Sequence, residues 1–268
     1  MRLVYLGTPE AAVPPLRALV EAGHDVALVV SRPDKRRGRG GALLPSPVKA
    51  AATELGIPVT EQVDDVLDVG ADLGVVVAFG RIIKPHVIEA LPLVNIHFSL
   101  LPRWSGAAPV ERAILAGDTQ TGVCLMTIEE ELDTGAVYDR AIVDIGPDET
   151  ADELRARLVD VGTRLLVDNL HRGLGTPVPQ EGELTYAAKI DPAELQIDWS
   201  RPAEEIHRLV RIGGAWTTFR GKRLKVHRTR IGDDGALEIL EVQPEGKGRQ
   251  PYDAWRRGAR LAPGEWFG

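Results

Sequence analysis

Residues 93–106 read LVNIHFSLLPRWSG, and this stretch decides how the rest of the chain is interpreted. The run from Leu93 to Phe98 is apolar enough for a buried strand, yet it contains Asn95 and His97. Side chains two residues apart in a strand lie on the same face of the sheet. Two buried polar groups need hydrogen-bond partners, or they cost free energy. The pattern is typical either of a satisfied structural pair or of a site where an amide and an imidazole act on one substrate.

Apolar runs alternate with amphipathic stretches through the first 170 residues. The sequence predicts strands at Val4–Leu6, Val26–Val30, Leu73–Ala78 and Val94–Phe98, and helices at Ala11–Glu21, Val48–Leu55, Pro85–Ala90, Pro109–Ala116 and 150–170. Continuous Val, Ile and Leu runs suit strands that are buried on both faces. This alternation predicts an α/β fold with a mostly parallel sheet covered by helices.

Composition narrows the class of protein. The 268 residues are 44% hydrophobic and 26% charged, as in globular proteins, and no apolar stretch is long enough to span a membrane. Cys124 is the single cysteine, which excludes an intrachain disulfide and a cysteine-rich zinc site. The six histidines lack the spacing of metal ligands. We therefore expect a cytoplasmic protein with no membrane segment and no metal site.

Charge is distributed unevenly along the chain. Residues 201–268 hold 14 Lys and Arg against 9 Asp and Glu, a net +5, while residues 1–200 carry a net −12. We expect a catalytic domain over 1–175, a linker over 176–200 and a small β-rich domain over 201–268. The basic tail favours an anionic partner, although a charge of this size is also found on ordinary solvated surfaces.

Three loops and one acidic turn are candidate parts of a site. The first loop contains Thr8 and does not continue as G-x-G-x-x-G, which disfavours nicotinamide binding. The second, 32–41, packs basic residues between glycines and suits phosphate, or is a solvated loop. The third, 78–83, allows close main-chain approach to a flat ring. In the turn, Asp133 precedes Thr-Gly and could orient an imidazole.

Taken together, these segments resemble the 10-formyltetrahydrofolate-dependent formyltransferases. The resemblance covers most of the chain, and its segments are Gly7–Glu10, Arg32–Val48, Val77–Gly80, Asn95–Pro102, Gly106–Pro109, Leu132–Gly135 and Asp198–Trp199. Asn-x-His, Ser-Leu-Leu-Pro and the later Asp-x-Gly are typical of the whole family. The basic loop and Gly-Ala-Ala-Pro narrow the resemblance to the branch that acts on methionyl-tRNA.

The resemblance implies a Rossmann-like formyltransferase domain followed by a small, shortened, OB-like β-barrel that binds tRNA. It implies that Asn95, His97 and Asp133 are catalytic, that 10-formyltetrahydrofolate donates the formyl group, and that initiator methionyl-tRNA accepts it. We expect a monomer. Folate contacts are expected from Arg81, Ile83, Leu101, Pro102, Glu129 and Glu130. Substrate and tRNA contacts are expected from Thr8, Arg32, Lys35, Arg36, Arg37 and Arg39.

Three departures from the family pattern bear on the acceptor. Ser105 stands where the tRNA enzymes usually have arginine, Ala11 stands where a larger apolar residue often lines the methionine pocket, and the C-terminal domain is short. The alternative function is therefore formylation of another amine, such as an amino-sugar nucleotide, with the same three catalytic residues. Formate release from folate and inactive RNA binding are weaker alternatives.

Overall fold

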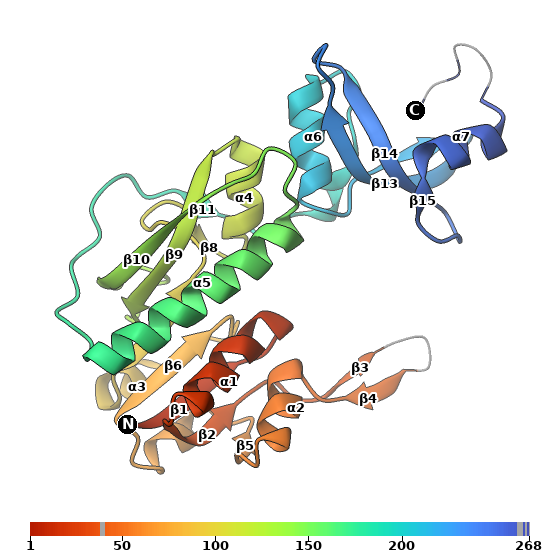
Figure 1. Ribbon diagram of the computed structural model, residues 1–268. Coiled ribbons are helices and arrows are strands. Elements are labelled where there is room, and N and C mark those ends of the chain that lie inside the picture. The colour runs from red at the N-terminus through yellow and green to blue at the C-terminus, as the bar shows by residue number, and fades with distance from the viewer. Residues whose placement is uncertain (38–40, 262–264, 266, 268) are drawn as a thin grey trace. The chain divides into compact units, whose positions relative to one another are not determined.

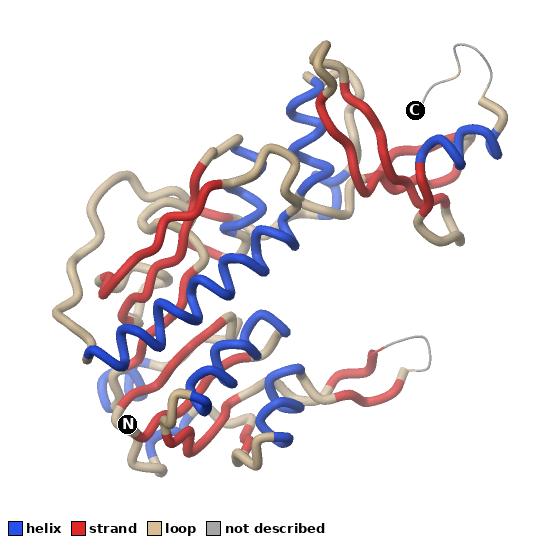
Figure 2. Tube along the Cα trace, viewed as in Figure 1, coloured by secondary structure: helices blue, strands red, loops and turns tan. Residues whose placement is uncertain are grey.

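The computed structural model describes residues 1–37, 41–261, 265 and 267, and these divide into two compact units. The first unit comprises Met1–Gly106, Thr121–Val143 and Arg155–Tyr186; the second comprises Ala107–Gln120, Asp144–Leu154 and Ala187–Gly268. Figure 1 labels the helices and strands, and Figure 2 shows the chain trace coloured by secondary structure.

A seven-stranded sheet forms the centre of the first unit, in the order β10-β9-β7-β6-β1-β2-β5. Its strands are β1 (Arg2–Gly7), β2 (Asp25–Val30), β5 (Val59–Thr60), β6 (Leu73–Val77), β7 (Leu93–His97), β9 (Gln120–Thr127) and β10 (Val137–Asp144). The pairs from β7 to β5 are parallel, and β9 joins β7 antiparallel. The predicted α/β class with a mostly parallel sheet is confirmed.

The predicted helices are also present. They are α1 (Val13–Glu21), α2 (Pro47–Glu54), α3 (Pro85–Ala90), α4 (Pro109–Ala116) and α5 (Ala151–Arg172). Thr150 caps the start of α5, since its hydroxyl accepts from the Glu153 N–H while the Glu153 carboxylate accepts from Thr150. Gly162 lets α5 approach the sheet closely, because a Cβ there would lie 2.8 Å from Ile96. Within the described residues, no helix has the length and apolar character needed to cross a membrane.

Strand register aligns the carboxyl ends of the parallel strands. Gly7 pairs with Val77, and Val77 pairs with Ile96, so the residues that follow these strands share one edge of the sheet. Thr8 and His97 therefore lie along this edge, the usual ligand-binding edge of open α/β sheets.

The basic 32–41 segment includes part of a short hairpin. β3 (Lys35–Arg37) pairs antiparallel with β4 (Ala42–Leu44), so that Arg36 lies opposite Leu43. Leu43 is 65% exposed. The sequence suggested only a loop here; pairing satisfies main-chain groups that a loop would leave to water.

The C-terminal part of the second unit contains a small antiparallel sheet, as expected, together with two helices. Its elements are α6 (Ala203–Arg211), β12 (Trp216–Phe219), β13 (Lys222–Ile231), β14 (Leu237–Pro244), β15 (Gln250–Pro251) and α7 (Tyr252–Ala259), with strand order β12-β13-β14-β15. Aromatic rings build its core: Trp199 stacks on Phe267 at 4.9 Å, and Phe219 meets Trp255 edge-on at 5.0 Å. The remaining short strands, β8 (Ser105–Gly106) and β11 (Tyr186–Ala187), form a two-stranded sheet.

Candidate active site

The structure brings His97 and Asp133 together at the carboxyl edge of the first unit's sheet. His97 is the last residue of β7 and is 6% exposed. Asp133 follows β9 in a turn, and its Oδ1 lies 3.5 Å from His97 Nδ1. A buried carboxylate at this distance stabilises a positively charged imidazole. The sequence offered Asp133 as a carboxylate that could orient an imidazole, and the structure brings the two side chains together.

Asn95 lies on the same strand, two residues before His97, and is half-buried. The strand alternation places both side chains on one face of the sheet. Over the described part of the chain, the Asn95 side-chain amide has no hydrogen-bond partner. Because polar groups in such positions are usually hydrogen-bonded, this amide is available to a bound molecule.

Both ring nitrogens of His97 face acceptors. Nε2 lies 3.0 Å from the Trp104 carbonyl oxygen, and Nδ1 faces the Asp133 carboxylate. A doubly protonated imidazolium donates to both, whereas a neutral ring offers only one N–H. An acceptor therefore lies at each ring nitrogen of His97.

Left-handed backbone conformations gather around this pair. Asp133 has φ +56°, Trp104 has φ +61°, and Ala78, directly after β6, has φ +46°. The second carboxylate oxygen of Asp133 accepts from the Gly106 N–H at 2.8 Å. Residues other than glycine adopt this backbone region at a cost in conformational free energy, and such strain concentrates at functional sites.

The expected folate residues fall into two groups. Arg81 and Ile83 lie on the turn after β6, where Arg81 Nη1 donates to the Glu61 carbonyl at 2.6 Å and Ile83 packs partly against the core. Between them, Ile82 is 91% exposed. Gly80 has φ +65°, and its carbonyl accepts from the Arg32 guanidinium.

The second group lies near β9. Leu101 is buried in a cluster with Cys124, Met126 and Val137, so its main chain, rather than its side chain, can meet a ligand. The Leu101–Pro102 peptide is cis. Glu129 and Glu130 are exposed in the loop after β9.

The expected tRNA residues lie along the same edge and on the hairpin. The Thr8 hydroxyl donates to the Phe79 carbonyl at 3.3 Å. Lys35 and Arg36 lie on β3, where Arg36 Nη1 donates to the Gly41 carbonyl at 3.4 Å. Arg39 and the side chain of Arg37 lie outside the described residues.

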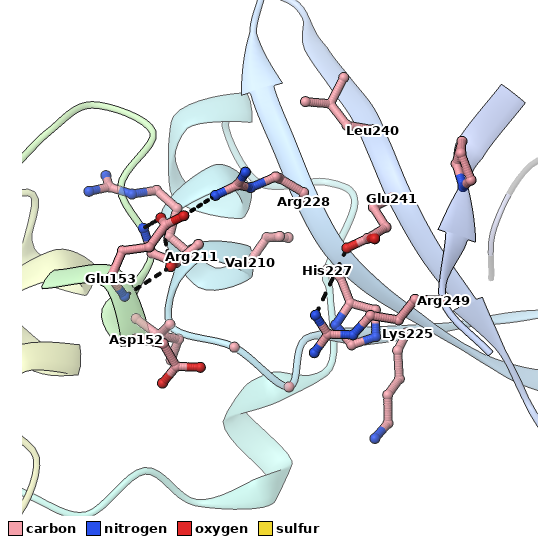
Figure 3. A pocket seen from close by; sticks show the side chains of 15 residues that line it. Asp152, Glu153, Val210, Arg211, Lys225, His227, Arg228, Leu240, Glu241 and Arg249 are labelled. Atoms are coloured by element: carbon pink, nitrogen blue, oxygen red, sulfur yellow. Dashed lines mark hydrogen bonds and ion pairs between the residues drawn. The ribbon is translucent and has the colours of Figure 1, made fainter. Parts of the chain in front are cut away.

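A cavity that the sequence did not predict lies in the second unit (Figure 3). Its volume is about 690 Å³, and its charged lining includes Arg211, Lys225, Arg228, Arg249, Asp152, Glu153 and Glu241. Arg228 pairs with Glu153, and Arg249 lies 4.0 Å from Glu241, whereas Lys225 has no ion-pair partner within the described residues. Hydrogen bonds from Thr150, supplemented by Arg228, lower the pKa of Glu153 to about 2. The run of basic residues along β13 was the available signal for this cavity.

Metal binding and cysteine nucleophilic catalysis are two other candidate chemistries. Among the described residues, no three His, Cys, Asp or Glu side chains converge as a metal site. Cys124 is buried, and this burial raises the pKa of its thiol. A buried, protonated thiol is a poor nucleophile.

Comparisons with known proteins show the family of this chain. Residues 1–170 match the family model described as formyl transferase, and residues 189–234 match the formyl transferase C-terminal domain. The chain is 43% identical to the methionyl-tRNA formyltransferase of Roseobacter denitrificans over 302 aligned positions, covering 100% of this chain and 99% of that protein.

Solved structures show the same fold. The methionyl-tRNA formyltransferase from Clostridium thermocellum superposes with a TM-score of 0.68 at 17% identity, covering 92% of this chain and 100% of that one. An N-formyltransferase from Helicobacter canadensis, in complex with folinic acid and dTDP-3-aminofucose, gives 0.69 at 20% identity, covering 86% and 88%. With both family models matched and full-length identity at this level, the chain belongs to the formyl transferase family, in its methionyl-tRNA formyltransferase branch.

Proposed function

We propose that this chain transfers a formyl group from 10-formyltetrahydrofolate to the amino group of initiator methionyl-tRNA. The observation that carries the proposal is the free Asn95 amide beside the His97–Asp133 pair, in a chain of this family. Formyl transfer needs donors aimed at a developing oxyanion and a group that manages the amine proton. The three side chains supply both.

The chemistry is an acyl transfer. The amine nitrogen of methionine attacks the formyl carbon, a tetrahedral oxyanion forms, and the bond from carbon to folate N10 then breaks. Asn95 Nδ2 and His97 donate hydrogen bonds to the oxyanion. Asp133 stabilises the imidazolium and accepts the proton lost by the amine through water, and N10 takes up a proton as it leaves.

His97 donates to the oxyanion through Nε2, while Nδ1 stays directed at Asp133. In the structure, Nε2 is directed at the Trp104 carbonyl oxygen. The oxyanion therefore shares this N–H with the carbonyl, which keeps the direction of the ring. A negatively charged acceptor forms a stronger hydrogen bond than a neutral carbonyl, so the oxyanion takes the larger share as charge develops.

10-Formyltetrahydrofolate supplies the formyl carbon. The turn at Arg81 and Ile83 and the exposed Glu129 and Glu130 suit a polar heterocycle, because main-chain groups and carboxylates match ring N–H and carbonyl groups. The main chain of Leu101 and Pro102 completes this proposed folate site.

The tRNA is proposed to bind two basic regions, one in each unit. The first comprises Thr8, Arg32 and the β3 side of the hairpin, Lys35–Arg37, continuing to Arg39. The second is the cavity around Lys225, whose ammonium has no carboxylate partner among the described residues. Unpaired cations on an otherwise acidic protein attract phosphate, and the resulting affinity falls with salt.

We include in the proposal a monomer that acts in the cytoplasm.

The deciding experiment follows labelled formyl from 10-formyltetrahydrofolate to charged initiator tRNA, with an amino-sugar nucleotide in a parallel reaction. Label on the tRNA supports the proposal. Label only on the sugar, or release of free formate, would retain the fold and overturn the acceptor. Turnover that falls steeply with salt is a second signature of the tRNA acceptor.

A further inference from the structure

We propose that Gln180 and Thr185 are positioning residues for the His97–Asp133 pair. This inference rests on the proposed function of that pair. Both residues lie in the 176–187 segment, which the sequence presents as part of a linker.

Gln180 holds the turn that carries Asp133. Its Nε2 donates to the Asp133 carbonyl at 2.7 Å and to the Gly135 carbonyl at 2.9 Å, so both N–H groups of the amide are used. Gly135 fits tightly in the same turn, since a Cβ there would lie 2.0 Å from the Thr127 carbonyl oxygen. These contacts hold the Asp133 backbone in its left-handed conformation and so fix the direction of its carboxylate.

Thr185 holds the turn that carries the other acceptor of His97. Its Oγ1 accepts from the Trp104 N–H at 2.8 Å, its carbonyl accepts from the Ser105 N–H at 2.9 Å, and its N–H donates to the Pro102 carbonyl at 3.3 Å. Trp104 also has a left-handed backbone, and its carbonyl faces His97 Nε2. Thr185 therefore determines where that carbonyl points.

Gln180 and Thr185 each position the group that faces one of the two ring nitrogens of His97. Gln180 fixes the position of the carboxylate near Nδ1, and Thr185 fixes the carbonyl near Nε2. Each side chain acts through main-chain groups of a neighbouring turn, so each is a positioning residue. Displacement of a catalytic group by about 1 Å costs about a hundredfold in rate, and loss of a supporting hydrogen bond costs about 10- to 100-fold.

Thr185 allows a matched pair of variants. Thr185→Val keeps the shape but removes the hydroxyl, and we expect kcat to fall about 10- to 100-fold while KM for folate and tRNA stays within about twofold. Thr185→Ser keeps the hydroxyl and should return kcat to within about threefold of the wild type. Rescue by serine separates the hydrogen bond from packing, because serine lacks the methyl group.

Gln180 allows an isosteric exchange. Gln180→Glu places a carboxylate oxygen against two carbonyl oxygens. Gln180→Asn shortens the side chain by one methylene, so its amide no longer reaches them. Both variants should lower kcat by about tenfold or more. The control is Glu183→Gln, the reverse exchange at an exposed position of the same segment, which should leave kcat unchanged. If Gln180→Glu does not fold, Gln180→Asn is the variant that tests the inference.

The outcomes are distinct. Wild-type kcat in Thr185→Val and in the Gln180 variants would overturn this inference, as would a raised KM with unchanged kcat or a failure of serine to rescue. Absence of formyl transfer to methionyl-tRNA by the wild type would instead overturn the proposed function. Circular dichroism and thermal unfolding of each variant establish that the compared proteins are folded.

Discussion

Asp133 uses its two carboxylate oxygens for different partners: Oδ2 accepts from the Gly106 N–H at 2.8 Å, and Oδ1 lies 3.5 Å from His97 Nδ1. The first contact fixes the carboxylate, and the second gives the imidazole a negative neighbour. Because Asp133 is about as buried as His97, with side-chain exposures of 10% and 7%, solvent screens this interaction weakly. The pair therefore holds a fixed carboxylate against the imidazole, on the strand that also carries Asn95.

Asn95→Ala should leave the fold intact and reduce kcat by about a hundred- to a thousandfold, the usual cost of one oxyanion donor. His97→Ala should lose most turnover for the same reason. The measurement is single-turnover formyl transfer, with circular dichroism as the test of folding. Wild-type rates in either folded variant would contradict the mechanism.

Gly135→Ala should lower both stability and kcat. The added Cβ would lie 2.0 Å from the Thr127 carbonyl oxygen, so the turn that carries Asp133 must move. We expect the free energy of unfolding to fall by about 1–3 kcal/mol, as for an overpacked core site. Gly175→Ala is the matched control, since a Cβ there meets nothing within 4 Å. Equal behaviour of the two variants would show that the turn tolerates displacement.

Arg36→Ala should raise the apparent KM for tRNA. In a plot of log KM against log salt concentration, the slope should fall by about 0.7–0.9, as expected for one lost phosphate contact. Replacing Arg36, Arg37 and Arg39 together should enlarge the effect. Arg164→Ala removes one exposed charge from α5 and is the control. An unchanged slope in the triple variant would mean that the hairpin does not contact phosphate.

Lys225→Ala tests the cavity of the second unit in the same way. Lys225 lacks an ion-pair partner among the described residues, so its removal should cost tRNA affinity and leave folate KM unchanged. The control is Lys84→Ala, an exposed lysine of the first unit 3.9 Å from Asp64. Equal tRNA KM values in the two variants would exclude the cavity from tRNA binding.

Stability should fall on acidification through His207, which is buried in α6. Its Nδ1 pairs with the Thr229 hydroxyl at 2.9 Å, and its Nε2 lies 3.0 Å from the Pro147 carbonyl and 3.2 Å from Asp148. Desolvation lowers the pKa of His207 below its ordinary 6.5, aided by Arg211 and opposed by the Pro147 carbonyl, Asp148 and Glu204.

The direction of this change in stability follows from how the folded and unfolded chains bind the His207 proton. Below pH 6.5 the unfolded chain binds this proton more readily than the folded one, so the contribution of His207 is complete above that pH and is lost as pH falls through the lowered pKa. Urea unfolding at about pH 7.5 and about pH 5.5 should show a smaller difference in His207→Gln than in the wild type. The control is the exposed His86→Gln, and an unchanged difference in His207→Gln would contradict the prediction.

The sequence by itself determined the α/β class, the alternation of β1, β2, β6 and β7 with helices, and the shared face of Asn95 and His97; it did not predict β5, β9 or β10. These features depend on periodicity and on short-range turn chemistry, both of which are local properties of the chain. Its turn position indicated Asp133 as a carboxylate that could orient an imidazole, and the resemblance grouped it with Asn95 and His97. Its role in catalysis stays a proposal, together with the folate and tRNA residues.

Only the tertiary structure decided which distant groups meet. Gln180 reaches the Asp133 carbonyl across 47 positions, and Thr185 reaches Trp104 across 81. No periodicity marks such residues, because a hydrogen bond between two loops depends on where the packed sheet places their ends. The same reason applies to the cavity around Lys225, whose walls come from α6, β13 and β14 and from the start of α5. Local pattern thus determines the elements of this protein, and packing over long sequence separations determines the surroundings of its histidine.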